Sequence, residues 1–331
     1  MIFIKKNLNV LIRFTVLCSI LLLLPAAIRP HTFKKKGEVE LLINKLQNDK
    51  PDIVFIGNSM TNTRIAPILF YKLTNLKCML ICRGGVMSSV WYLILKNVVA
   101  ASGMKPKAVF ISFRDTELTE PLYRTNGRYR SDILNFCSDK EPIIDIILSK
   151  NKNYYEMLNE IVGDIYPIEL KYSHESYVSE IIFKIINYFS NNNKLKTDQI
   201  NNLLDLKNFR PVSMDGENKT KEQINCNFHQ MLKDSFLPYI IDIAQKNNLN
   251  LIFIRDQKRP TPFGPPQQTP ELRQYIEDLS KYISHYNYRF YDFTGNPRIT
   301  SYMYGAGDHI DEKYKKKYTR IFVETVRDGL Q

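Results

Sequence analysis

Histidine, cysteine and tryptophan are scarce in this chain, and their scarcity excludes several kinds of site. The 331 residues include five histidines, five cysteines and one tryptophan. Neither the histidines nor the cysteines cluster at the spacings typical of metal ligands, so the sequence predicts no metal site. A P-loop is also missing, and we expect no nucleotide or other cofactor.

Positive charge is plentiful but is not gathered in one place. The formal net charge of +12 suits anionic partners such as phospholipid head groups, acidic polysaccharide or nucleic acid. The lysines are scattered, however, and neither a Lys/Arg stripe nor a recognition motif is present, so no nucleic-acid partner is predicted. A hydrophobic content of 44% with 12% aromatic residues indicates a globular chain.

An apolar run that spans a membrane comfortably is missing as well. The uncharged run Phe14 to Ile28 has 15 residues, short of the roughly 20 that a span needs. Adding residues 10–12, with Arg13 snorkelling towards the head groups, brings it close to spanning. Because no A-x-A cleavage site is evident, we expect an uncleaved signal anchor at 1–30 that contacts the membrane through residues 10–28. The body is then membrane-anchored and periplasmic or otherwise extracytoplasmic.

Strand and helix patterns alternate through most of the remaining chain. A tether and linking helix at 31–48 precede a single α/β domain at 49–331. Alternation of this kind favours a parallel sheet covered by helices on both faces. A largely helical insertion at about 116–248, expected to form a lid or partner surface, interrupts the pattern. The expected strands are 52–56, 77–82, 107–113, 249–256 and 288–293, and the expected helices are 65–73, 88–101, 271–285 and 311–327.

Residues with chemical potential follow the predicted strands. Ligands of an open parallel sheet bind beyond the carboxyl ends of its strands. The segments at these ends contain a hydroxyl, an imidazole, carboxylates and exposed N–H groups, which nucleophilic acyl transfer requires. The alternative for the first segment is a turn in which Ser59 only caps the next helix. These segments are Gly57-Asn58-Ser59, Arg83-Gly84-Gly85, Arg114-Asp115, Arg255-Asp256 and the loop 305–311.

Three of these segments resemble blocks of the SGNH, or GDSL-like, hydrolase superfamily. They are "VFIGNSMT", "CRGGVMSS" and "GDHID", and the resemblance covers roughly 50–115 and 245–331. It implies that Ser59 is the nucleophile, that His309 is the base, and that the N–H of Gly84 or Gly85 helps to bind an oxyanion. It also implies the flavodoxin-like SGNH fold, a three-layer α/β/α arrangement around a five-stranded, mostly parallel sheet.

Two family positions differ in this chain. The third family block usually provides an Asn donor after the third strand. The sequence here reads "SFRDTELT", so Arg114 or Asn58 could replace it. The last block is usually Asp-x-x-His, yet Ala306 stands three residues before His309. Either the adjacent Asp308 orients the imidazole, or a backbone carbonyl does so and the site is a dyad.

The remaining charged residues at the strand ends have two interpretations. Arg114 and Asp115 form either a structural ion pair or a substrate contact. Arg255 has the same two alternatives.

The resembled branch is membrane-anchored and is associated with O-acetylation of cell-envelope polysaccharides. We therefore expect an O-acetyltransferase or acetylesterase that acts on cell-envelope or secreted polysaccharide through an acyl-serine. An external domain cannot reach cytoplasmic acetyl-CoA, so a multi-spanning membrane-bound O-acyltransferase is implied as the acyl donor. Transfer also requires an acceptor site that excludes water, for which the insertion is the expected material. The alternative is a catalytically degenerate scaffold that binds polysaccharide or a membrane partner.

Overall fold

The computed structural model describes residues 14–17, 37–121, 125, 128–138, 140–150, 226–261, 264 and 268–330. The chain divides into two compact units, and nearly all described residues belong to the larger one, which comprises 35–125, 129–151 and 213–331. Residues 14–17 are helical and exposed; the rest of the expected membrane segment, 10–28, and most of the expected insertion lie outside the described residues. Within the described ranges, no helix is long and apolar enough to cross a membrane.

A five-stranded parallel sheet forms the centre of the larger unit. Its spatial order is β2-β1-β3-β4-β5, and all four neighbouring pairs are parallel. This confirms the predicted α/β class and is the order of flavodoxin-like sheets. Each strand lies within two residues of its expected range. The strands are β1 (Ile53–Gly57), β2 (Cys78–Cys82), β3 (Ala108–Phe113), β4 (Leu251–Arg255) and β5 (Arg289–Asp292).

The central strands are continuous apolar runs because both of their faces are covered. Successive side chains of a strand point to opposite faces. Val54 and Ile56 of β1 accordingly enter one hydrophobic cluster, whereas Ile53 and Phe55 enter the other. Phe55 stacks on Phe110 of β3 with ring centroids 4.9 Å apart. The sheet therefore lies between two apolar layers.

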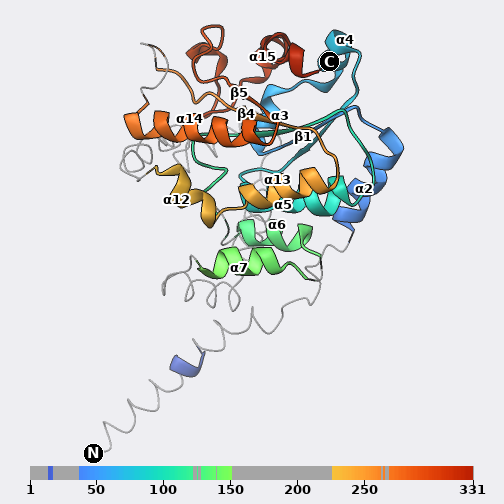
Figure 1. Ribbon diagram of the computed structural model, residues 1–331, viewed down its shortest axis with the longest axis vertical. Coiled ribbons are helices and arrows are strands. Elements are labelled where there is room, and N and C mark those ends of the chain that lie inside the picture. The colour runs from blue at the N-terminus through green and yellow to red at the C-terminus, as the bar shows by residue number, and fades with distance from the viewer. Residues whose placement is uncertain are drawn as a thin grey trace, which may run out of the picture. The chain divides into compact units, whose positions relative to one another are not determined.

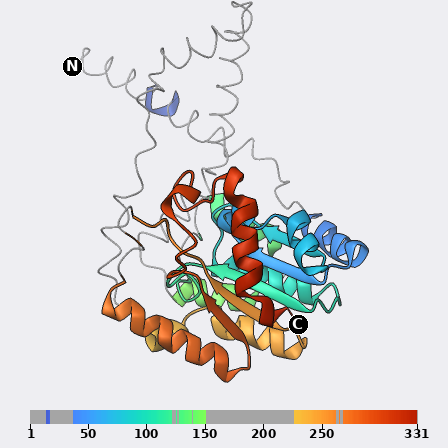
Figure 2. The ribbon, with the colours of Figure 1, turned by 90° about the horizontal axis from the view of Figure 1, so that it is seen from above.

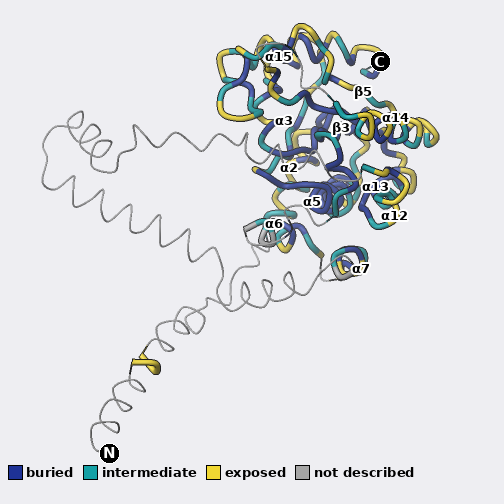
Figure 3. Tube along the Cα trace, turned by 90° about the vertical axis from the view of Figure 1, so that its left-hand side faces the viewer, coloured by how far each residue is buried: buried dark blue, intermediate teal, exposed yellow. Residues whose placement is uncertain are grey.

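Helices supply both layers (Figures 1 and 2). One face is covered by α2 (Glu38–Asp49), α5 (Ser88–Leu93), the π-helix η1 (Ile94–Ala100), α12 (Phe228–Lys233), α13 (Leu237–Lys246) and α14 (Pro270–His285), with α6 (Arg128–Phe136) and α7 (Pro142–Lys150) packed on that cluster. The opposite face is covered by α4 (Pro67–Thr74) and α15 (Glu312–Thr325). Figure 3 shows the buried trace at the sheet and exposed turns on the outer helices.

The segment after β1 differs from expectation. One helix over 65–73 is predicted, but the structure has two, α3 (Ser59–Arg64) and α4. The break has a local cause, because Pro67 disfavours helical backbone at the residue before it and is well suited to the first position of a new helix. Ala66 is accordingly extended. As a result Ser59 opens a short helix of its own at the carboxyl end of β1.

Candidate active site

The turn between β1 and α3 fixes the position of Ser59. The side chain of Asn58 accepts a hydrogen bond from the Met60 N–H at 2.9 Å and so caps α3. Gly57 is needed at the end of the strand, because a Cβ there would lie 2.0 Å from the Thr61 hydroxyl oxygen. Asn58 thus has an observed capping role.

His309 is carried by a closed loop between η2 (Ser301–Met303) and α15. Tyr304 and Ile310 form an antiparallel bridge across its base. The N–H of Gly305 donates to the His309 carbonyl at 2.9 Å, and Gly307 adopts the left-handed conformation with φ 55°. These constraints hold the imidazole at a defined place above the sheet edge.

The structure brings Ser59 and His309 together across 250 positions of sequence. The His309 Nε2 lies 2.8 Å from the Ser59 Oγ, and its Nδ1 lies 3.0 Å from the Ala306 carbonyl oxygen. A carbonyl can only accept, so Nδ1 carries the hydrogen and Nε2 is left to accept from the serine hydroxyl. This tautomer is the one that a general base for Ser59 requires.

Asp308 does not occupy the orienting position expected of a triad acid. One of its oxygens bonds to the Arg114 guanidinium, and the other accepts from the Arg259 N–H at 2.8 Å. The orienting acceptor is instead the carbonyl of Ala306, three residues before the histidine. Of the two expected arrangements, the structure therefore has the one with a backbone carbonyl.

Arg114 is engaged by two carboxylates. Its backbone N–H, Nε and Nη2 all donate to Glu117, at 2.9, 3.0 and 2.8 Å, while Nη1 bonds to Asp308. Burial raises the pKa of Glu117, although Arg114 opposes this effect. Burial lowers the pKa of Arg114, but the two carboxylates raise it overall. Its partners are thus Glu117 and Asp308, not the Asp115 of the expected ion pair.

Asp115 and Arg255 belong to a second set of ion pairs. Arg255, whose side chain is 1% exposed, binds Asp115 at 2.7 Å and Asp292 at 2.9 Å, and Lys258 also contacts Asp115, at 2.5 Å. Burial raises the pKa of Asp115, but Lys258 and Arg255 lower it below its ordinary value. Asp115 also has a φ of 41°, which is strained for a residue with a Cβ. These pairs join the ends of β3, β4 and β5, which is a structural role.

The glycine pair after β2 lies beside the serine turn. The N–H of Arg83 donates to the Gly57 carbonyl at 3.2 Å, so the chain from Arg83 onward starts at the end of β1. Gly84 is exposed, with no atom within 4 Å of an added Cβ, and Gly85 is buried with φ 78°. The glycine pair therefore follows directly on the contact that joins the end of β2 to the end of β1.

A buried ion pair beneath the site was not predicted. Arg64, at the end of α3, lies 3.3 Å from Asp256 and donates to the Gln257 carbonyl at 3.0 Å. The Tyr304 hydroxyl donates to that same carbonyl at 3.1 Å. Burial raises the pKa of Asp256, with Arg64 acting against it. The sequence shows Asp256 at a strand end but contains no signal that selects Arg64 as its partner.

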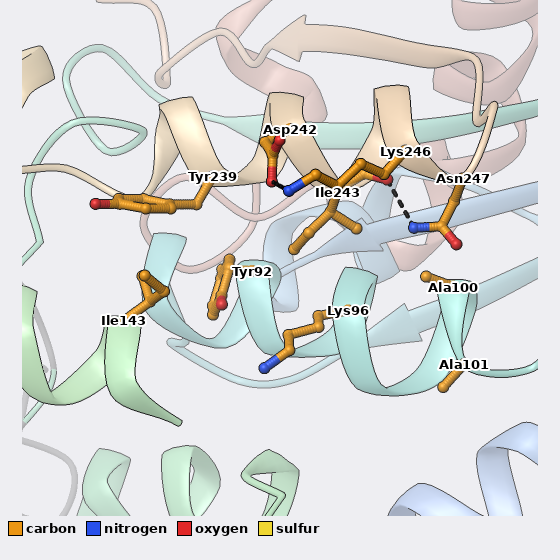
Figure 4. Close-up of a pocket in the computed structure, with 10 residues that line it drawn as sticks. All are labelled: Tyr92, Lys96, Ala100, Ala101, Ile143, Tyr239, Asp242, Ile243, Lys246 and Asn247. Atoms are coloured by element: carbon orange, nitrogen blue, oxygen red, sulfur yellow. Dashed lines mark hydrogen bonds and ion pairs between the residues drawn. The ribbon is translucent and has the colours of Figure 1, made fainter. Parts of the chain in front are cut away.

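A separate groove of about 640 Å³ lies between η1 and α13 (Figure 4). None of the residues that line it belongs to the Ser59–His309 site. The groove is lined by Tyr92, Lys96, Ala100, Ala101, Ile143, Tyr239, Asp242, Ile243, Lys246 and Asn247.

Within the part of the chain that the structure describes, no group of three or more His, Cys, Asp or Glu side chains could hold a metal ion.

Comparison with known proteins adds two similar solved structures. One, described as a "putative acylhydrolase" of Bacteroides fragilis, aligns with a TM-score of 0.41 at 11% identity, covering 92% of this chain and 100% of the other. A GDSL-like lipase of Bacteroides thetaiotaomicron aligns with a TM-score of 0.37 at 10% identity, covering 88% and 98%. No family model and no curated protein sequence matches. The geometry of the site must therefore carry the functional argument.

Proposed function

We propose that this chain is a serine-dependent acyl-ester enzyme of the SGNH type. The observation that carries the proposal is the pair of contacts made by His309. Its Nε2 lies 2.8 Å from the Ser59 hydroxyl oxygen and its Nδ1 lies 3.0 Å from the Ala306 carbonyl. A serine, a base in hydrogen-bond reach and an acceptor that orients the base are the parts of an activated nucleophile.

The first half of the proposed reaction forms an acyl-serine. His309 Nε2 takes the proton of Ser59 as the serine oxygen attacks the ester carbonyl carbon. The N–H groups of Ser59 and of Gly84 or Gly85 bind the developing oxyanion, each at a typical value of roughly 3 kcal/mol. His309 then gives its proton to the departing alcohol, and the acyl group remains on Ser59.

The second half releases the acyl group. His309 takes a proton from an incoming hydroxyl as its oxygen attacks the acyl carbon. The bond between that carbon and the Ser59 oxygen then breaks, and His309 returns the proton to the Ser59 oxygen. Water as the acceptor gives hydrolysis, and a sugar hydroxyl gives transfer. Throughout the cycle the Ala306 carbonyl keeps the Nδ1–H of His309 in place, so that the same nitrogen faces Ser59 in every step.

The narrower proposal is O-acetyl transfer to cell-envelope or secreted polysaccharide. Its support is the sequence resemblance to the membrane-anchored branch. The narrower proposal includes a membrane-bound O-acyltransferase as the donor of the acyl group and an extracytoplasmic location. The competing scaffold interpretation depended on the altered third block and on the missing Asp at position 306. The Ala306 carbonyl provides an acceptor there, which favours an enzyme.

Covalent labelling of the full-length chain by a fluorophosphonate tests the general proposal. We expect labelling at Ser59, located by mass spectrometry, with no label at that position in Ser59→Ala and a rate at least about 100-fold lower in His309→Gln. Ser284→Ala is the matched control, because Ser284 is exposed on α14 and also has a neighbouring histidine. Labelling that does not depend on Ser59 would overturn the proposal.

Acetyl release distinguishes transfer from hydrolysis. Acetyl-ester cleavage by the wild type is measured with and without polysaccharide acceptors. Transfer predicts acetylated polysaccharide at the expense of free acetate, whereas an esterase produces acetate alone. Both products must disappear in Ser59→Ala.

A further inference from the structure

Asp308 is fixed beside the proposed base without touching it. Both of its oxygens are occupied, one by the Arg114 guanidinium and one by the Arg259 N–H. The contact with Arg259 joins the histidine loop to the segment after β4, and the contact with Arg114 joins it to the end of β3. A carboxylate is thus the anchor of the loop that carries His309.

The negative charge of Asp308 affects the proposed base, because it favours the protonated form of His309. Asp308 is the residue next to His309 in the chain. A negative charge near an imidazole favours its protonated form, which cannot accept the proton of Ser59. The effect is strong where water is partly excluded, and the Asp308 side chain is only 22% exposed. A neutralising partner is therefore required if Asp308 is to anchor the loop and leave the base free.

Arg114 has the geometry of such a partner. Its side chain is 21% exposed, and the buried Glu117 accepts hydrogen bonds from the Nε and Nη2 of that side chain and from the Arg114 backbone N–H. These bonds leave Nη1 of the guanidinium to bind Asp308. Because the planar fork is fixed before any substrate arrives, the cation needs no reorganisation to cover the carboxylate.

We propose that Arg114 is a positioning residue that cancels the charge of Asp308, so that Asp308 anchors the histidine loop without stabilising the protonated form of His309. This inference rests on the function proposed above. It assigns Arg114 neither to an oxyanion hole nor to substrate binding, and it gives Asp308 a role that differs from that of a triad acid.

The other charged groups around the loop largely balance in pairs. Arg64 is matched by Asp256, and Lys258 by Asp115. Loss of Arg114 removes the group that lowers the pKa of the buried Glu117, so burial then favours the neutral form of Glu117, and Asp308 remains as the uncovered charge of the loop. The charged and titratable groups that contact the loop or interact electrostatically with Asp308 are Arg64 of α3, Arg114 after β3, Asp256 and Arg259 after β4, and Tyr304 at the base of the loop.

The test is the pH dependence of fluorophosphonate labelling at Ser59 in the full-length chain. For Arg114→Gln we expect the pH midpoint of labelling to rise by about one unit, with a rate about three- to fivefold lower at pH 7 that recovers near pH 9. Asp308→Asn moves the midpoint the opposite way. The double variant returns it to within a few tenths of a unit of the wild type, because neither charge is then present.

Arg259→Gln is the matched control. It removes a positive charge from the same loop region, but the exposed Arg259 side chain contacts the Gly305 carbonyl and not Asp308, and the backbone bond to Asp308 is retained. We expect less than about a third of the Arg114→Gln shift. Thermal unfolding followed by circular dichroism identifies any variant that does not fold.

The outcomes separate this inference from the proposed function. An equal loss of rate at every pH in Arg114→Gln, or a double variant slower than either single one, overturns the positioning role alone. A folded wild type without label at Ser59 overturns the proposed function and this inference with it. Return of the midpoint in the double variant supports the charge pair, because a purely structural role gives no such reversal.

Discussion

Gly57 determines how closely α3 approaches the end of β1. Any side chain at this position meets the Thr61 side chain. An added Cβ at residue 57 would lie 2.0 Å from the Thr61 hydroxyl oxygen and 2.8 Å from the Thr61 Cβ. The residue between them, Ser59, therefore depends on a glycine that touches no substrate. This dependence is a matter of space and not of backbone conformation, since Gly57 belongs to a regular strand.

We predict that Gly57→Ala lowers the free energy of unfolding by about 1–3 kcal/mol, the usual cost of overpacking. It should also slow labelling at Ser59, because α3 must move away from β1. Urea unfolding and the labelling rate measure the two effects. Gly295→Ala is the control, since an added Cβ there has no atom within 4 Å. Equal stability of the two variants would contradict the packing argument.

The orienting group of His309 shows what single residues can reveal in a sequence. The proximity of Ser59 and His309 was predictable, because each residue lies in a motif that follows a predicted strand. The acceptor for Nδ1 was not decided, because Ala306 contributes a backbone carbonyl that every residue type possesses. Asp308 has the right chemistry and the adjacent position, yet its bonds go to Arg114 and Arg259.

At the scale of elements, the strands were the most predictable parts. Parallel strands that are buried on both faces are continuous apolar runs, as in "IVFI" of β1 and "AVFISF" of β3. Helices were less certain, because their ends depend on local competition. The predicted helix at 88–101 continues from α5 into the π-helix η1, a change of winding that the apolar spacing does not indicate.

Glu141 is the contact that holds the start of α7 against η1. It accepts from Lys96 at 2.6 Å, from Asn97 at 2.6 Å and from the Ser138 hydroxyl at 2.7 Å. Burial raises the pKa of Glu141, but the bonds from these three residues lower it below its ordinary value overall. A folded-state pKa that is depressed stabilises the fold above the unfolded pKa, and this contribution is lost as the pH falls through the folded-state pKa.

We predict that Glu141→Gln lowers the free energy of unfolding at pH 7 by about 1–3 kcal/mol, as expected for bonds to a buried charge. Its difference from the wild type should shrink as the pH falls below about 4 and onward through the depressed folded-state pKa, where the wild-type carboxylate becomes protonated too. Asp242→Asn breaks the exposed pair with Lys246 and should cost less than about 0.5 kcal/mol. Denaturant titrations at several pH values measure both; a pH-independent difference would contradict the role of charge.

The whole molecule brings together parts that lie far apart in the sequence. Ser59 and His309 are separated by 250 positions, and Arg64 and the Gln257 carbonyl by 193. The first pair was predictable because both members lie in motifs at the same edge of the predicted sheet. The second was not, because the groups that Arg64 contacts depend on how α3 is packed against the end of β4. Sequence patterns were therefore least informative about long-range polar contacts.

Arg64, at the end of α3, and Asp256, after β4, form an ion pair in which both residues are buried. We predict that Arg64→Met lowers the free energy of unfolding at pH 7 by about 3–5 kcal/mol, because it leaves a buried carboxylate without its cation. Adding Asp256→Asn should restore much of this loss, since no charge then remains to be paired.

The pH dependence gives the sharper test of that pair. Burial raises the pKa of Asp256 in the folded protein, so its contribution to stability is complete below about pH 4 and is lost as the pH rises through the folded-state value. Without Arg64 this pKa rises further, so Arg64→Met should lose more stability than the wild type as the pH rises above about 4, and the double variant should not. Urea unfolding across this range measures the difference. A deficit of Arg64→Met that is the same at every pH would mean that Arg64 contributes packing and not charge.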